Sequence, residues 1–258
     1  MTKPIEDRKF INALARGLTV LAAFRASDHG LTHAEIAART GLSKATATRL
    51  IHTLAETGHL IRDGRGGQFR LGPAVLALGA VAHAQTSFMD LIEEEMQDFA
   101  NRTGTLAVIG VRSADRMMLV RTWRPVGTAS IWLEPGHRVP IMGSSLGQAH
   151  VAALCDDAFE HLQPDAALRA FRADGYSQLI ARGYTVPREE TRFAATIKAV
   201  AVPYLAREYG APISFCCGAM PDMLNDDRIR AEVGPGLVAL VRALEAKTGQ
   251  ASALARRG

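Results

Sequence analysis

The residues best suited to chemistry in this chain lie between positions 43 and 52, on one outer face of a predicted helix. Apolar side chains recur there at i, i+3, i+4 and i+7, which predicts a buried stripe of Ala47, Leu50, Ile51 and Leu54. Helical geometry turns the neighbouring positions to the opposite side. That outer face combines cations, hydroxyls and a small methyl group, which suit the phosphates and base edges of a DNA major groove. The predicted DNA-contacting residues on it are Ser43, Lys44, Ala45, Thr46, Thr48, Arg49 and His52.

This helix is the second of a predicted pair that spans residues 31–54. Ile36 and Ala37 supply the apolar positions of the first helix. Gly41 ends it, because glycine adopts the left-handed backbone of a helix C-terminus without a Cβ clash. Ser43 then caps the second helix. A polar outer face is common on any surface helix. The helix pair by itself is therefore equally consistent with DNA binding and with an ordinary solvent-exposed surface.

A glycine-rich hairpin follows the pair and favours DNA binding. Residues 59–72 read as two short strands whose connecting tip holds Arg65 among three glycines. A helix pair with a basic-tipped hairpin is a winged helix-turn-helix, which places Arg65 against phosphate or the minor groove. Charge agrees: residues 1–72 hold eleven Lys and Arg against six Asp and Glu, whereas the remainder holds nineteen against twenty.

Two further helices are predicted around this motif. The helix over residues 10–24 carries an apolar side that we expect to pack behind the reading pair: Ile11, Leu14, Leu18, Leu21 and Ala22. Pro73 starts a second helix, in a first turn where a missing N–H costs nothing. Its run of small apolar residues, 74–84, predicts a linker helix that packs on a second copy of itself or on the C-terminal domain. The alternative is a core helix of one larger domain.

The rest of the chain reads as an α+β domain. Helices are expected over residues 88–102, 146–154, within 156–183, and over 226–248 with a kink at 234–236. Strands are expected over 106–111, 117–121 and 128–133, within 136–142 before the helix over 146–154, from 184, over 197–202 and over 213–217. Pro203 is expected to close the strand over 197–202. The predicted organisation is a DNA-binding domain over 1–72, a linker helix over 73–87 and a third segment over 88–258.

A candidate ligand site lies where the helix over 146–154 begins. Backbone N–H groups and the hydroxyls of Ser144 and Ser145 can hold a small carboxylate, although plain N-capping by either serine is an equal reading. The predicted pocket walls around it are Trp132, Met142, Leu146 and Cys216. Lys198 either counters an acidic ligand or lies at a strand edge in solvent.

Other classes of function are disfavoured. The three cysteines and eight histidines show no metal-ligand spacing or disulfide framework, so no metal or cofactor is expected. A charged N-terminus and the lack of an eighteen-residue apolar run predict a cytosolic protein without a membrane span. A hydrolase with Cys216 or Ser144 as nucleophile and His137, His150 or His161 as base remains an alternative, but no GxSxG elbow supports it.

The order of these parts resembles the IclR family of bacterial transcriptional regulators over essentially the whole chain. The matching stretches are ALARGLTVLAAF, LTHAEIAARTGLSKATATRLIHTL, GHLIRDGRGGQFRLGPAVLALG, GHRVPIMGSSLGQAHVAAL and ARGYTVPREE. The resemblance implies a winged helix-turn-helix, a linker helix, and a GAF-like effector domain with a curved antiparallel sheet. It also implies dimers or tetramers on pseudo-palindromic operator DNA, and a small organic or aromatic acid as effector. A DNA-binding protein without an effector is the remaining alternative.

The chain departs from the family pattern near the predicted ligand site. Gln148 stands where a lysine is usual, and the acidic pair Glu189-Glu190 is displaced by two positions. The strand over 196–203 lacks the frequent cysteine, and Cys216-Cys217 occupy a strand where serines often meet ligand. The ligand chemistry of better-known members therefore does not transfer to this chain.

Overall fold

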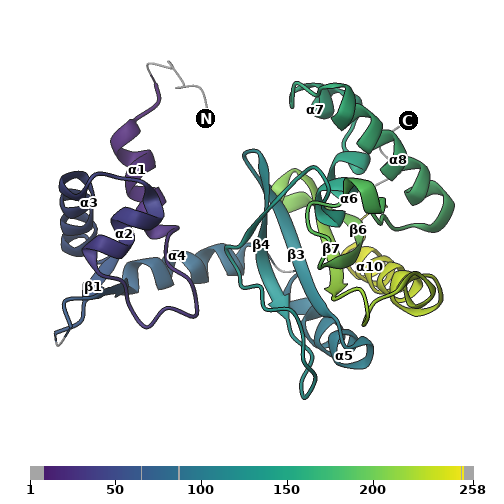
Figure 1. Cartoon of the computed structure of the whole chain (residues 1–258), viewed down its shortest axis with the longest axis horizontal. Helices are drawn as coiled ribbons and strands as arrows, with labels where there is room; N and C mark the ends of the chain where they lie inside the picture. The colour runs from purple at the N-terminus through teal and green to yellow at the C-terminus, as the bar shows by residue number, and fades with distance from the viewer. Residues whose placement is uncertain (1–8, 65, 87, 251, 253–258) are drawn as a thin grey trace. The chain divides into compact units, whose positions relative to one another are not determined.

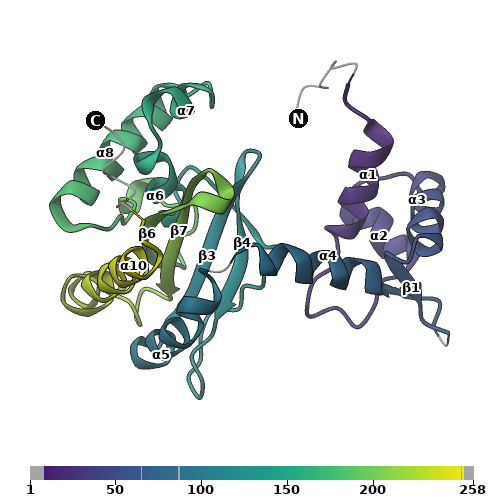
Figure 2. The same cartoon turned by 180° about the vertical axis from the view of Figure 1, so that it is seen from behind.

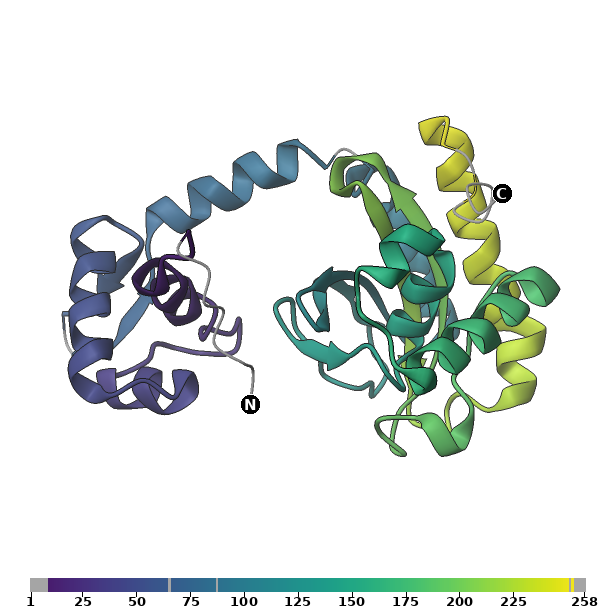
Figure 3. The ribbon, with the colours of Figure 1, turned by 90° about the horizontal axis from the view of Figure 1, so that it is seen from above.

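The structure, a computed structural model, describes residues 9–64, 66–86, 88–250 and 252. The chain divides into two compact units, Met1–Gln85 and Thr86–Gly258 (Figures 1, 2 and 3). Each unit has its own buried core.

The first unit contains the predicted helix pair. Helix α2 spans His33–Thr40 and α3 spans Lys44–Glu56. Thr32 and Glu35 form a reciprocal capping box at the start of α2, and Gly41 ends that helix with a left-handed φ of 68°. The Ser43 side chain accepts the Thr46 N–H and so caps α3. The core of this unit includes Ile36, Ala47 and Ile51, with Leu50 and Leu54 packed against it, which confirms the predicted apolar stripe.

The hairpin is also present. Strands β1 (Leu60–Arg62) and β2 (Phe69–Leu71) pair antiparallel, with Leu60 opposite Leu71 and Arg62 opposite Phe69. Phe69 makes a further bridge to Leu31, which ties the hairpin to the segment before α2. Arg65, the predicted tip residue, lies outside the described residues.

The flanking helices differ from expectation in what they bury. Helix α1 spans Asn12–Leu21 and contributes Val20 to the core, whereas Ile11, Leu14 and Leu18 are each more than half exposed. Leu21 packs against the core as predicted, but Ile11, Leu14, Leu18 and Ala22 do not, because helical spacing cannot by itself tell which apolar stripe a core accepts. Helix α4 (Pro73–Ala84) has no buried residue, so the reading as a core helix is wrong.

The second unit is built on a five-stranded sheet in the order β5-β4-β3-β7-β6, with every neighbouring pair antiparallel (Figures 1 and 2). Its strands are β3 (Leu106–Ser113), β4 (Arg116–Trp123), β5 (Arg138–Pro140), β6 (Lys198–Ala206) and β7 (Ala211–Ala219). The α+β class predicted from the sequence is confirmed.

Helices cover both faces of this sheet. On one face pack α5 (Glu93–Thr103), the 3₁₀ turn Asp90–Ile92 before it, and α10 (Gly234–Thr248). A 3₁₀ turn Arg207–Tyr209 joins β6 to β7. Helix α6 (Ser145–Ala153) covers the other face, with α8 (Ala166–Arg182) packed on α6 (Figure 3). Helix α7 (Asp156–Glu160) and the 3₁₀ turn Glu189–Thr191 flank them. The predicted helix over 226–248 divides into α9 (Asp226–Arg228), a π-helical turn (Ile229–Val233) and α10.

Three strand predictions need correction. Residues 128–133 form no strand, and the short β5 takes the place at the edge beyond β4. Near Tyr184 only a single bridge forms, between Thr185 and Ala201. Pro203 does not end its strand but lies within β6 opposite Ser214. A proline is accepted there because β6 is the outer strand of the sheet, where a backbone N–H can be missing without breaking an internal ladder.

Helix α6 is buried along its entire length, and its neighbours approach its backbone at glycines. A Cβ atom at Gly147 would overlap the backbone of Ile141. At Gly175 of α8, a Cβ atom would stand 2.6 Å from the Cγ atom of Gln148. These two positions fix how closely α6 packs against the chain before it and against α8.

We predict that Gly147→Ala lowers the free energy of unfolding of the second unit by about 1–3 kcal/mol, because the added methyl group overpacks a rigid backbone contact. Chemical denaturation followed by circular dichroism measures the change. Gly79→Ala, in α4 with open space around it, is the matched control and should leave this transition unchanged. Equal midpoints for both variants would contradict the packing argument.

Candidate functional site

The outer face of α3 presents the predicted DNA-contacting side chains to solvent. Ser43, Lys44, Ala45, Thr48, Arg49 and His52 are exposed, and Thr46 is half-buried beside the Ser43 cap. The Ser43 hydroxyl lies 2.9 Å from the Thr46 hydroxyl, so the helix start carries two adjacent oxygens. Because Ala47 and Ile51 face the core, the opposite side of α3 must face outward. Helical periodicity in the sequence is enough to predict which α3 residues face outward, because this surface lies on a single helix.

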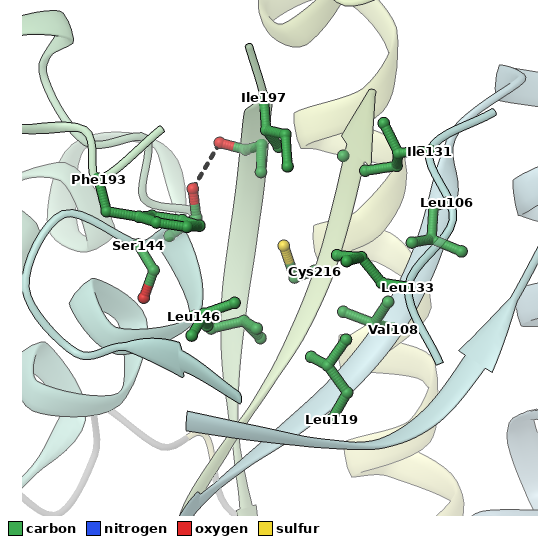
Figure 4. A pocket seen from close by; sticks show the side chains of 14 residues that line it. Leu106, Val108, Leu119, Ile131, Leu133, Ser144, Leu146, Phe193, Ile197 and Cys216 are labelled. Atoms are coloured by element: carbon green, nitrogen blue, oxygen red, sulfur yellow. Dashed lines mark hydrogen bonds between the residues drawn. The ribbon is translucent and has the colours of Figure 1, made fainter. Parts of the chain in front are cut away.

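A pocket lies between α6 and the face of the sheet that α6 covers (Figure 4). Its volume is about 450 Å³ when its mouth and the open solvent before it are included. Leu106 and Val108 of β3, Leu119 of β4, Leu146 of α6 and Cys216 of β7 form its walls. Apolar residues from the loop before β5 and from the segment before β6 complete the lining: Ile131, Leu133, Phe193 and Ile197. No charged side chain is found among the described residues that line it.

The polar groups of this pocket belong to the start of α6. Ser144 and Ser145 both line it. The Ser144 hydroxyl donates to the Pro140 carbonyl at 2.5 Å and accepts the Gly147 N–H at 3.0 Å, so it acts as the N-cap of α6. The Ser145 hydroxyl donates to the Ala199 carbonyl at 2.6 Å. Both hydroxyl protons are therefore engaged, and the donors left at a helix start are the first backbone N–H groups, here those of Ser145 and Leu146.

The structure brings only part of the predicted ligand site together. Ser144, Ser145, Leu146 and Cys216 line the pocket, but Trp132, Met142 and Lys198 do not. Trp132 is 62% exposed and stacks on Arg124, whose guanidinium carbon lies 3.7 Å from the ring centroid.

Strand alternation explains the position of Lys198. Its neighbour Ala199 lines the pocket, so the Lys198 side chain points to the other face of β6. There its ammonium group pairs with Asp226 at 2.6 Å. The same alternation could have identified Ala199 as a lining residue, but the walls from β3 and β4 depend on strand pairing that no local sequence signal reports.

The arrangement does not support the hydrolase alternative. Burial raises the pKa of the Cys216 thiol well above its usual range and raises that of Cys217 to about 12, so neither forms a thiolate near neutral pH. Burial also lowers the pKa of His150 to about 4, and its Nδ1 atom lies 2.7 Å from the Pro212 carbonyl oxygen. The Ser144 hydroxyl donates its hydrogen bond to the Pro140 carbonyl oxygen rather than to a histidine.

Within the described part of the chain, no three His, Cys, Asp or Glu side chains gather in a metal-binding cluster. No helix among residues 9–64, 66–86 and 88–250 is both long and apolar enough to cross a membrane.

Comparison with known proteins matches residues 13–64 to the IclR helix-turn-helix domain. The chain is 30% identical to the Pca regulon regulatory protein of Pseudomonas putida over 171 residues, which cover 64% of this chain and only 56% of that relative. An IclR family transcriptional regulator from Brucella abortus shares the fold with a TM-score of 0.69 and 26% identity, over 96% of both chains. An IclR homolog from Microbacterium hydrocarbonoxydans, solved with 4-hydroxybenzoate, shares it with a TM-score of 0.64 and 21% identity, over 90% of this chain and 99% of that one. The relatives are transcriptional regulators rather than enzymes.

The cysteines allow a test of the burial described for the pocket. Cys155 is exposed, whereas Cys216 and Cys217 are buried with raised pKa values. We expect a chromogenic thiol reagent to label one cysteine per native chain at pH 8, and three after unfolding. Cys155→Ser should abolish the native signal. Rapid labelling of Cys216 in that variant would show that the pocket wall is open to solvent.

Proposed function

We propose that this chain is a transcriptional regulator of the IclR type, because its helix-turn-helix segment matches that domain and its fold matches that of such regulators. In this proposal it is a ligand-responsive, sequence-specific DNA-binding protein that controls catabolism of a small organic or aromatic acid. We assign DNA reading to residues 1–72, the connection to residues 73–87 and effector binding to residues 88–258. Regulators of this type work in the cytoplasm, where the operator DNA is.

The observation that carries the DNA assignment is the exposed face of α3. Arg49 stands at the centre of this face, and its guanidinium can donate two hydrogen bonds to a guanine edge. Lys44 and the hydroxyls near the helix start suit phosphate contacts, which position a protein on the duplex. We propose that the hairpin acts as the wing and that Arg65 adds a backbone or minor-groove contact.

The effector assignment rests on the apolar pocket of the second unit. In this proposal an apolar ring lies against the side chains of β3, β7 and α6, and its carboxylate meets the first N–H groups of α6, where the helix dipole favours negative charge. The 4-hydroxybenzoate-bound homolog shows that a protein of this fold holds an aromatic acid. A DNA-binding protein without an effector is the second candidate, but it would not need an apolar pocket between α6 and the sheet.

Assembly is proposed from exposed apolar surface in the first unit. Leu14 and Leu18 of α1 and Leu76 and Val81 of α4 are each more than half exposed. Such surface marks a protein contact. We propose a homodimer, or a tetramer of two dimers, bound to a pseudo-palindromic operator with half-sites about one helical turn apart or a multiple of it.

We predict that Arg49→Ala weakens operator binding by about 1–3 kcal/mol, because a bidentate contact to a base is lost. Fluorescence anisotropy at fixed salt measures it. Arg102→Ala removes the same charge from an exposed site at the end of α5 and serves as the control. Operator binding that is equal in the two variants would exclude this face of α3 as the reader.

A second prediction concerns the effector pocket. Ala199→Leu adds three carbons to the pocket lining, so we expect it to abolish stabilisation by benzoates in a thermal-shift screen while operator binding persists. Ala129→Leu makes the same change on an exposed loop and should respond to ligand as the unaltered protein does. A full ligand response from Ala199→Leu would place the effector elsewhere.

A further inference from the structure

A second pocket of the C-terminal unit has the opposite chemistry to the apolar one. It is formed by the end of α8, the segment around the 3₁₀ turn Glu189–Thr191, the first residue of β6, and α9 with the π-helical turn. Its volume, including its mouth, is about 710 Å³. Five cations line it together with two carboxylates, and the cations are Arg182, Arg188, Arg192, Lys198 and Arg230.

Two of these cations, Arg192 and Lys198, are nearly buried, whereas the carboxylates paired with them are exposed; Arg188 is instead exposed and paired with the largely buried Asp174. The Arg192 side chain is only 10% exposed, whereas Glu189, 3.1 Å away, is 86% exposed. Lys198 is 13% exposed, and its partner Asp226 is 64% exposed. A buried charge needs a counter-ion, while an exposed carboxylate can return to water at little cost. An entering anion can therefore replace these carboxylates.

Three of the positive charges stabilise the ionised form of one carboxylate, Asp226. The pKa of the Asp226 carboxyl is lowered chiefly by its hydrogen bond with Lys198, and Arg230 and Arg192 add to this effect through their charge. Arg230 is also paired with Asp227 at 2.6 Å, and that carboxylate is 87% exposed. A single carboxylate thus lies in the field of three cations, and concave surfaces concentrate such a field.

We propose that this pocket is a binding site for a small anion with two or more negative charges, separate from the apolar effector pocket. Guanidinium groups pair with phosphate or carboxylate oxygens through two parallel hydrogen bonds, and an ammonium group adds a point charge. The shared chemistry is therefore a phosphorylated or polycarboxylic small molecule. An acid with a single negative charge would pair with only one or two of these cations and would leave the others with their present carboxylate partners.

Isothermal titration of the full chain with pyrophosphate and with citrate tests the proposal, with acetate and chloride compared at equal ionic strength. We expect one site per chain for at least one polyanion, and the better ligand distinguishes phosphoryl from carboxylate chemistry. Lys198→Gln should weaken binding roughly tenfold or more. Arg230→Gln, which alters a side chain that is 63% exposed, should do the same without disturbing the core.

Three controls separate this site from others. Arg169→Gln removes an exposed arginine that is ion-paired with Glu160 and should keep full affinity. Arg49→Ala and Ala199→Leu should also keep it, because the DNA-reading face and the apolar pocket lie outside this site. Polyanions that bind no better than acetate would overturn the proposal, as would unchanged affinity in both Lys198→Gln and Arg230→Gln. Loss of binding in Arg49→Ala alone would place the anion on the DNA-reading face.

Discussion

The close packing of α6 between the sheet and α8 is the contact on which the apolar pocket of the second unit depends. Gly147 lets the chain before α6 lie directly against its first turn, and Gly175 lets α8 do so on the outer side. This contact holds Ser144 and Ser145 at the edge of the sheet, where both serines meet the apolar pocket. A displaced α6 would remove one wall of the pocket together with the polar groups at the start of this helix.

The sequence predicted which face of α3 is exposed far better than it predicted which residues line the apolar pocket. The face of α3 follows from the position of Ile51 and Arg49 on one helix, and helical periodicity is a local property. The pocket walls come from strands that pair across more than a hundred residues, such as Val108 opposite Cys216. No alternation within one segment reports such pairing, and so Trp132 was placed in a pocket that it does not line.

The sheet separates two environments of different chemistry. Ala199 and Cys216 face the apolar pocket, whereas Lys198 and Cys217 turn to the opposite face. Two consecutive residues of β6 thus face different surfaces: Ala199 faces the uncharged pocket, and Lys198 faces the pocket lined by cations. The short segment from Arg192 to Lys198 borders both pockets, since Arg192 lines the charged one and Phe193 the apolar one.

Pro203 removes a hydrogen-bond donor from the outer edge of strand β6. The N–H and C=O groups of Ala201 point away from β7, because both bond to Thr185. Pro203, two positions later, presents the same side and has no N–H to offer. A strand from another molecule would find no continuous row of donors along this edge. The sheet is thus protected from the edge-to-edge pairing by which exposed strands begin aggregates.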